Sequence, residues 1–254
     1  MENESFLRMQ RGFSEVQRNI ENALLRRRPG VGISDKVTLL GASKTVPAED
    51  ILCAVQHFGL NLIGENRPQE LTEKYPALEG KIQQHFIGHL QTNKVKQVVG
   101  RVSVIESVDS ERLAAEINRR SAALGIVTDI LVEVNSGREE NKGGIFPEDV
   151  LAAARQFSSF DHLQVRGLMT MAPVCVEKEE YRKYFKETYS IFIDFLSQTS
   201  DNIREPILSM GMSDSYEIAV EEGATEVRVG SALFGRRIYP QTADSAQNTK
   251  KIQV

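Results

Sequence analysis

Short apolar segments alternate with longer amphipathic segments along most of the chain. The short segments are rich in β-branched residues and show little polar alternation, which is typical of parallel strands buried on both faces. They are VTLLGAS (37–43), LNLIGE (60–65), HFIGHL (85–90), VSVIESV (102–108), DILVEVN (129–135), QVRGLMTMA (164–172), PILSMG (206–211) and TEVRVGS (225–231). The pattern therefore predicts eight parallel strands.

Helices are predicted between these strands, because apolar positions there recur at helical spacing. The segments are 48–58, 68–75, 92–98, 110–124, 147–157, 177–197 and 214–222. Strict alternation of strand and helix indicates an α/β architecture. Eight such units favour a (β/α)8 TIM barrel over an open doubly wound sheet, since the G-x-G-x-x-G sequence is absent after the first strand.

An additional amphipathic helix is predicted before the first strand. Its apolar positions run from Phe6 to Leu24 at steps of three and four. Three arginines (26–28) follow, and we expect them to be solvated and to interact favourably with the negative end of the helix dipole. We expect this helix, within residues 1–30, to pack on a single barrel domain that spans 1–239. The polar segment 240–254 is expected to be disordered.

Composition and charge narrow the possible partners. A chain of 254 residues with 41% hydrophobic content suits one barrel of about 250 residues. The net charge of −4 argues against nucleic acid or anionic membrane as a partner of the whole surface. No stretch has the ~20 apolar residues of a membrane span, and the N-terminus lacks a secretory signal, so a cytoplasmic protein is expected. Cys53 and Cys175 are interpreted as packing residues.

Lys44 is the first candidate for chemistry, because it directly follows the first predicted strand. Functional groups of such barrels come from the carboxyl ends of the strands and the loops after them. An ammonium with an apolar approach is partly desolvated, which lowers its pKa and lets the amine attack an aldehyde to form a Schiff base. The alternative is a lysine that reaches solvent and pairs with a carboxylate.

The last two strands supply a candidate phosphate site. Gly230 and Ser231 end the eighth strand before a helical turn, and Ser213 follows the seventh strand. Barrels commonly bind phosphate at these two loops. A lysine nucleophile facing a phosphate site suggests pyridoxal 5'-phosphate as the ligand, although a sugar phosphate in a Schiff-base aldolase would also fit.

The motifs that carry these residues resemble the pyridoxal phosphate homeostasis family. The resemblance rests on LLGASKTVPAEDI, IGENRPQEL, HFIGHLQTNKVK, IESVDS, LVEVNSGREENKGGI, RGLMTMAP and LSMGMSDSYEIAVEEGATEVRVGSALFG. It implies a fold-type III pyridoxal phosphate barrel, similar to the N-terminal domain of alanine racemase.

The resemblance also implies roles for individual residues. Lys44 would form the Schiff base, and Asn66 would lie near the pyridine 3'-hydroxyl. Arg228 would lie close to either the ring nitrogen or the phosphate. The residues expected around the phosphate are Ser209, Ser213, Gly230 and Ser231.

The sequence favours a carrier or regulator of pyridoxal phosphate and amino-acid homeostasis over an enzyme. Racemases with a similar barrel use a second domain, and this chain leaves no room for one. The alternative is an amino-acid racemase or decarboxylase with His89 and Tyr216 as acid and base. A pure interaction module is the third possibility. We expect no metal, since His85 and His89 lie on a predicted strand, and we expect a monomer that delivers its cofactor to dependent apoenzymes.

Overall fold

Eight parallel strands close into a barrel and follow one another in chain order, β1 to β8, with β8 pairing back onto β1. The computed structural model describes residues 4–199, 203 and 205–235. The strands are β1 (Thr38–Ala42), β2 (Leu62–Glu65), β3 (Gln83–Phe86), β4 (Val104–Val108), β5 (Thr128–Val134), β6 (Leu163–Thr170), β7 (Ile207–Ser209) and β8 (Glu226–Val229). The predicted (β/α)8 barrel is confirmed.

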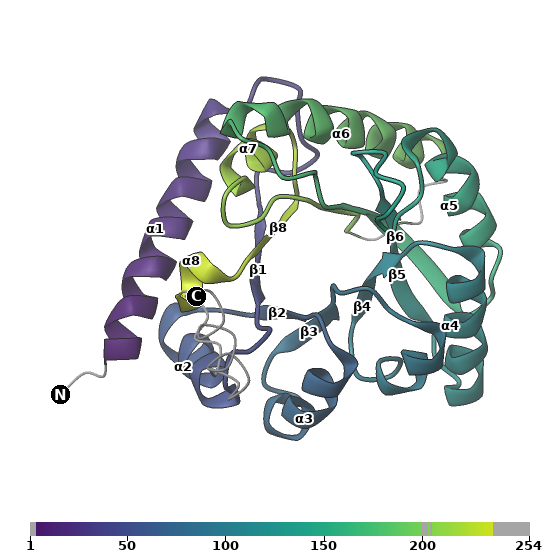
Figure 1. Ribbon diagram of the computed structural model, residues 1–254, viewed down its shortest axis with the longest axis horizontal. Helices are drawn as coiled ribbons and strands as arrows, with labels where there is room; N and C mark the ends of the chain where they lie inside the picture. Colours follow the sequence, from purple (N-terminus) through teal and green to yellow (C-terminus); the bar gives the residue numbers. More distant parts are fainter. Residues whose placement is uncertain (1–3, 200–202, 204, 236–254) are drawn as a thin grey trace, which may run out of the picture.

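Helices surround this barrel on the outside (Figure 1). The α-helices are α1 (Glu4–Arg26), α2 (Ala48–Phe58), α3 (Pro68–Leu78), α4 (Glu111–Leu124), α5 (Val150–Ser158), α6 (Tyr181–Gln198), α7 (Tyr216–Glu221) and α8 (Ser231–Phe234). Three 3-10 segments accompany them: η1 (Thr92–Gln97), η2 (Pro147–Asp149) and η3 (Lys178–Glu180). None of the described helices combines the length and hydrophobicity that a membrane span requires.

The third strand differs from its prediction. It runs from Gln83 to Phe86, whereas the apolar pattern predicted 85–90. After Phe86 the chain leaves the sheet, and Gly88 packs against the backbone of Asn66, where a Cβ would lie 2.1 Å from the carbonyl oxygen. The predicted strand end thus becomes a loop that is pressed against the end of β2.

The N-terminal helix α1 lies along the outside of the barrel beside α7 and α8, as Figure 1 shows. Its apolar face is buried through Met9, Phe13, Val16, Ile20 and Ala23. Gly12 permits the close approach, because a Cβ at this position would lie 2.2 Å from the carbonyl oxygen of Ala232 on α8.

Arg26 and Arg28 at the end of α1 are exposed, as the sequence suggested, but all three arginines also make specific contacts. Arg26 pairs with Glu221 and Glu217, and Arg28 pairs with Glu222. Arg27 donates to the carbonyl oxygens of Val220 and Ala224. These contacts attach the end of α1 to α7 and the loop after it. The predicted disordered segment 240–254 lies outside the described residues.

Candidate cofactor-binding site

A pocket of about 390 Å³ opens at the carboxyl ends of β1, β2 and β8. It brings together six of the seven residues that the sequence predicted for cofactor binding, namely Lys44, Asn66, Ser213, Arg228, Gly230 and Ser231. Lys44 is half-buried, and Arg228 is 4% exposed. The loops after strands that are far apart in sequence therefore form one site.

Lys44 lies in a tight turn that directly follows β1. The turn closes with a 3.0 Å hydrogen bond from the N–H of Val46 to the carbonyl oxygen of Ser43. Thr45 has a φ of 65°, which is the left-handed region that β-branched residues rarely adopt. Such a conformation costs of the order of 1–3 kcal/mol, so the surroundings must stabilise the turn.

A charged cluster behind the turn, Glu65, Glu70 and Lys74, provides this stabilisation. The Nζ of Lys74 donates to Ser43 O and to Glu65 Oε1, each at 2.8 Å. Glu70 Oε2 accepts from the N–H of Thr45 at 2.7 Å. Glu65 is fully buried, and burial raises its pKa against the opposing effect of Lys74. The residues on both sides of Lys44 are thus fixed from β2 and α3.

The opposite side of the pocket carries hydroxyl groups and close backbone. Ser231 Oγ donates to Ser213 Oγ at 3.2 Å, and the N–H of Gly230 lies 3.4 Å from the same oxygen. A Cβ at Gly230 would lie 3.2 Å from the carbonyl oxygen of Ala42, so this backbone approaches β1 closely. Hydroxyl and N–H donors at this spacing can bind a phosphate.

Ser209 does not line the pocket, in contrast to the other predicted residues. It is fully buried on β7, and its hydroxyl contacts Glu106, Glu226 and Arg228. The structure thus places the Ser209 hydroxyl against the guanidinium of Arg228 rather than among the residues that line the pocket. Its contact with the phosphate stays a prediction.

Asn66 gives an independent sign that the pocket accommodates a polar ligand. Its Oδ1 is buried and has no hydrogen-bond partner among the described residues. A buried polar atom without a partner costs free energy, and a ligand hydroxyl would remove that cost. This observation fits the expected position of Asn66 near the pyridine 3'-hydroxyl.

The structure does not bring together the acid and base proposed for an enzyme. Tyr216 accepts a 3.0 Å hydrogen bond from Asn19 under α1, and burial raises its pKa. His89 is 67% exposed beside Asp109 and lines a separate pocket after β3 and β4. Neither side chain lines the pocket of Lys44.

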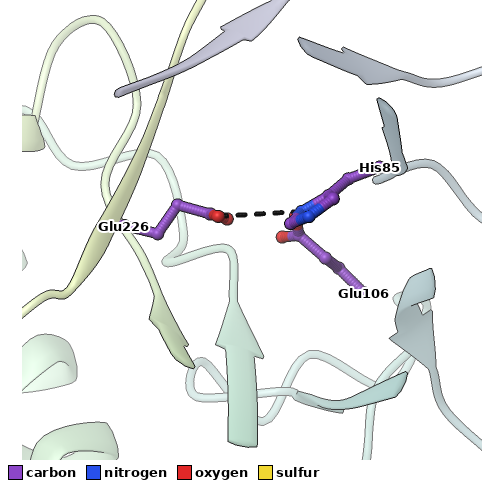
Figure 2. A group of neighbouring side chains, drawn as sticks. All are labelled: His85, Glu106 and Glu226. Carbon is purple, nitrogen blue, oxygen red and sulfur yellow. Dashed lines mark hydrogen bonds and ion pairs between the residues drawn. The ribbon is translucent and has the colours of Figure 1, made fainter. Parts of the chain in front are cut away.

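The buried side chains of His85, Glu106 and Glu226 lie close enough together to be considered as metal ligands (Figure 2). Their ligand atoms lie within 4.8 Å of one another. However, Arg228 reaches the group through Ser209, and its positive charge opposes a cation. We interpret the group as hydrogen-bonded rather than metal-binding.

Sequence reasoning missed several residues that line the pocket. Arg8 comes from α1, and Asp50 comes from the first turn of α2. Met212 lies in the loop after β7. Arg8 stands on a helix that has no strand end, so no local signal connects it to the site. Among the residues that the structure describes, Arg8, Lys44 and Arg228 give the pocket three basic side chains against one carboxylate.

The comparisons with known proteins agree with this geometry. The family described as alanine racemase, N-terminal domain, matches residues 41–238. A pyridoxal phosphate homeostasis protein of Aquifex aeolicus is 46% identical over 202 residues, covering 79% of this chain and 87% of its own length. The chain belongs to the pyridoxal phosphate homeostasis protein family.

Solved structures with the same fold support the family assignment. A protein of unknown function from Bifidobacterium adolescentis is 33% identical, with a TM-score of 0.84 over 92% of this chain and 97% of its own. PipY of Synechococcus elongatus, solved with PLP bound, is 33% identical, with a TM-score of 0.71 over 85% of this chain and 100% of its own. The pyridoxal phosphate homeostasis family thus has a relative of known fold that holds the cofactor.

Proposed function

We propose that this protein binds pyridoxal 5'-phosphate at Lys44 and acts as a carrier or regulator in pyridoxal phosphate and amino-acid homeostasis. The observation that carries the proposal is the pocket itself, which joins Lys44 to the donors Ser213, Gly230 and Ser231. The relatives named for this homeostasis role and the PLP-bound PipY structure support it.

The pocket residues match the two ends of this ligand. Arg8, Lys44 and Arg228 give the pocket a positive potential, which attracts the anionic phosphate. Ser213 and Ser231 supply hydroxyl donors to it. When bound, the cofactor supplies an aldehyde that condenses with the Lys44 amine to a Schiff base, with loss of one water. The turn that holds Lys44 fixes where its amine can be.

Asn66 and Arg228 would orient the ring. The unpartnered Oδ1 of Asn66 can accept a hydrogen bond from the ring hydroxyl. Arg228 carries donors and no acceptor, so facing the ring nitrogen it would leave that nitrogen without a proton. A ring without this proton withdraws electrons poorly, which favours binding and release over carbanion chemistry.

The composition of the pocket supports a binding protein over a racemase or decarboxylase. Among the described residues, the titratable side chains that line it are Arg8, Lys44, Asp50 and Arg228, and none is a histidine or a tyrosine. The relatives are named as homeostasis proteins rather than as enzymes. We therefore place the enzyme as the second candidate, to be tested by amino-acid turnover.

Borohydride trapping of the bound cofactor tests this proposal. The wild-type protein should be labelled covalently at a ratio approaching one cofactor per chain, and Lys44→Ala should abolish the labelling. The matched control is Lys36→Ala, which removes an exposed lysine before β1 and should leave labelling unchanged. Labelling of Lys44→Ala at the wild-type ratio would move the attachment site elsewhere.

Delivery of the cofactor, the monomeric state and the cytoplasmic location belong to the same proposal. A cofactor-loaded sample mixed with a dependent apoenzyme should restore that enzyme's activity faster than the Lys44→Ala protein does. Light scattering of the loaded and unloaded protein should give the mass of one chain, and a doubled mass would contradict the monomer.

A further inference from the structure

Five polar side chains form a closed cluster inside the barrel, beneath the cofactor pocket. They are His85, Glu106, Ser209, Glu226 and Arg228, and each is at most 4% exposed. We name them the interior cluster. Figure 2 shows the two glutamates directed toward each other and toward His85, from strands β4, β8 and β3. Two ionised carboxylates at this depth would be costly.

The hydroxyl of Ser209 reveals how many protons this cluster holds. Its Oγ lies 2.8 Å from Arg228 Nη1, 2.7 Å from Glu106 Oε2 and 2.8 Å from Glu226 Oε1. A serine hydroxyl donates once and accepts twice, and a guanidinium only donates. Ser209 therefore accepts from Arg228 and donates to one carboxylate. The other carboxyl group must be protonated, so that it donates to the second lone pair.

The position of His85 decides which glutamate carries this proton. Its Nδ1 lies 2.7 Å from Glu106 Oε1 but 3.6 Å from Glu226 Oε2. The pKa directions agree with this geometry. Burial and then the charge of Glu106 raise the pKa of Glu226 well above its usual value. Burial also opposes ionisation of Glu106, but the hydrogen bond and charge of His85 and the charge of Arg228 outweigh it and lower its pKa.

The charged or titratable groups that face Glu226 are Glu106 of β4, His85 of β3 and Arg228 of β8 itself. The charge of Arg228 also acts on Glu133 of β5, where it opposes the rise of the Glu133 pKa. One ionised carboxylate, that of Glu106, thus faces both the imidazole of His85 and the guanidinium of Arg228.

Arg228 connects this cluster to the pocket. It lines the pocket, and it also donates from Nη1 to Ser209 and from Nη2 to the carbonyl oxygen of Thr170 at 2.7 Å. We propose that Glu226 is held as the neutral acid, and that Ser209, Glu106 and Glu226 are positioning residues that fix the guanidinium of Arg228 at the cofactor pocket. None of the three is among the residues that line the pocket.

Infrared spectroscopy of the protein without cofactor tests the proton directly. Above the pKa of Glu133, the wild-type protein should show a carbonyl stretching band of a buried carboxylic acid, and Glu226→Gln should remove that band while Glu133→Gln keeps it. A spectrum with no acid band would overturn the proposal. So would stoichiometric Zn²⁺ binding that Glu226→Gln abolishes, because the cluster would then be a metal site.

Cofactor binding tests the positioning role, and this part rests on the proposed function. Glu226→Gln keeps a donor toward Ser209, so its dissociation constant for pyridoxal phosphate should stay within about threefold of the wild-type value. Glu226→Ala loses that donor, and its dissociation constant should rise by more than this. Glu106→Gln and Ser209→Ala should weaken binding about 10- to 100-fold, the range of one lost charge-assisted hydrogen bond, and shift the absorbance of the bound cofactor.

Equal effects of Glu226→Gln and Glu106→Gln would overturn the positioning role, as would unchanged binding and absorbance in Ser209→Ala. Should Glu106→Gln not fold, Ser209→Ala carries the same comparison with a change of one atom. A wild-type protein that binds no cofactor would refute the proposed function alone, since the infrared experiment still judges the proton on Glu226.

Discussion

The two sides of the cofactor pocket solve the problem of a buried charge in different ways. On the side of β1 and β2, Lys74 pairs with Glu65 and Glu70, and all contributors lie between residues 43 and 74. On the side of β7 and β8, Arg228 bonds to Ser209, which contacts Glu106 and Glu226, and His85 contacts Glu106, so the interior cluster draws on four strands, β3, β4, β7 and β8. On the first side, ion pairs of Lys74 hold the backbone turn at Lys44. On the second side, a hydrogen-bonded group that includes the neutral acid Glu226 holds the side chain of Arg228.

The two sides of the pocket should therefore tolerate different kinds of substitution. Removing one partner of a buried ion pair leaves an uncompensated charge, which costs about 3–5 kcal/mol. The interior cluster around Arg228 already contains a neutral acid, Glu226, so the neutral isostere Glu226→Gln should change cofactor binding little.

Replacement of Lys74 should have the largest effect. Lys74→Met leaves Glu65 fully buried without a cation and should lower the free energy of unfolding by about 3–5 kcal/mol. Chemical denaturation measures this change, and Lys81→Met, an exposed lysine just after α3, serves as the control. The loss should be smaller at acidic pH, where Glu65 can take up a proton. A loss below about 1 kcal/mol would show that the ion pair is dispensable.

Removal of the phosphate-side hydroxyls should weaken binding and leave the fold intact. The double variant Ser213→Ala and Ser231→Ala should lose about 3 kcal/mol of cofactor binding free energy, since each charge-assisted hydrogen bond contributes roughly 1.5–3 kcal/mol at most. Equilibrium dialysis measures the retention, with Ser197→Ala on the exposed face of α6 as the control. Unchanged retention would place the phosphate elsewhere.

Glu133 should make stability depend on pH. Burial, and then the charge of Asp109, raise the pKa of Glu133 to about 7, while Arg228 opposes them. As the pH rises from about 4.5 to 7, the carboxyl group ionises in the unfolded chain before it does in the folded protein, so stability falls and then levels off. Glu133→Gln should remove this fall.

The expected size follows from the shift of the Glu133 pKa. At about 1.4 kcal/mol per unit, a rise of the Glu133 pKa from 4.5 to about 7 should make Glu133→Gln more stable than the wild type by about 3 kcal/mol at pH 8, relative to their difference at pH 4. Urea denaturation of both proteins at the two pH values measures this. A difference that is the same at both pH values would mean that Glu133 ionises alike in the folded and unfolded chain.

The turn at Lys44 should give the smallest effect. Thr45→Gly relieves the left-handed backbone conformation and should stabilise the protein by about 1 kcal/mol, after the greater freedom of glycine in the unfolded chain is subtracted. Thr38→Gly, at an extended position of β1, is the matched control and should destabilise by a similar amount. A loss of stability in Thr45→Gly would mean that the side chain of Thr45 itself is needed.

Much of the fold could be predicted because its signals are local. The buried parallel strands appear as runs of β-branched residues, and α2 spans the predicted 48–58 because Pro47 and Gly59 bound it. The third strand was misplaced because the apolar residues of HFIGHL continue past Phe86, where the strand ends. The contact between Gly88 and Asn66 joins two separate loops and has no local signal.

The same reasoning applies to the site. Lys44, Ser213 and Ser231 follow strand ends and could be placed by position alone. Ser209 could not be placed in this way, because it is the last residue of a strand of only three residues. In so short a strand the sequence does not show whether a side chain points to the pocket or to the barrel interior. The partnership of Glu106 with Glu226 joins β4 to β8 and has no signature in either segment. The place of Arg8 in the pocket could be predicted only once the packing of α1 on the barrel was known.

The seating of Gly12 against Ala232 has a consequence for synthesis on the ribosome. The helix made first packs on the helix made last among the described elements, and β8, which carries Arg228, must join β1 before the sheet can close. In a nascent chain stalled before residue 226, Lys44 would therefore lie at the end of a β1 that has not yet paired with β8. The cofactor pocket can form only after β8 and α8 have left the ribosome.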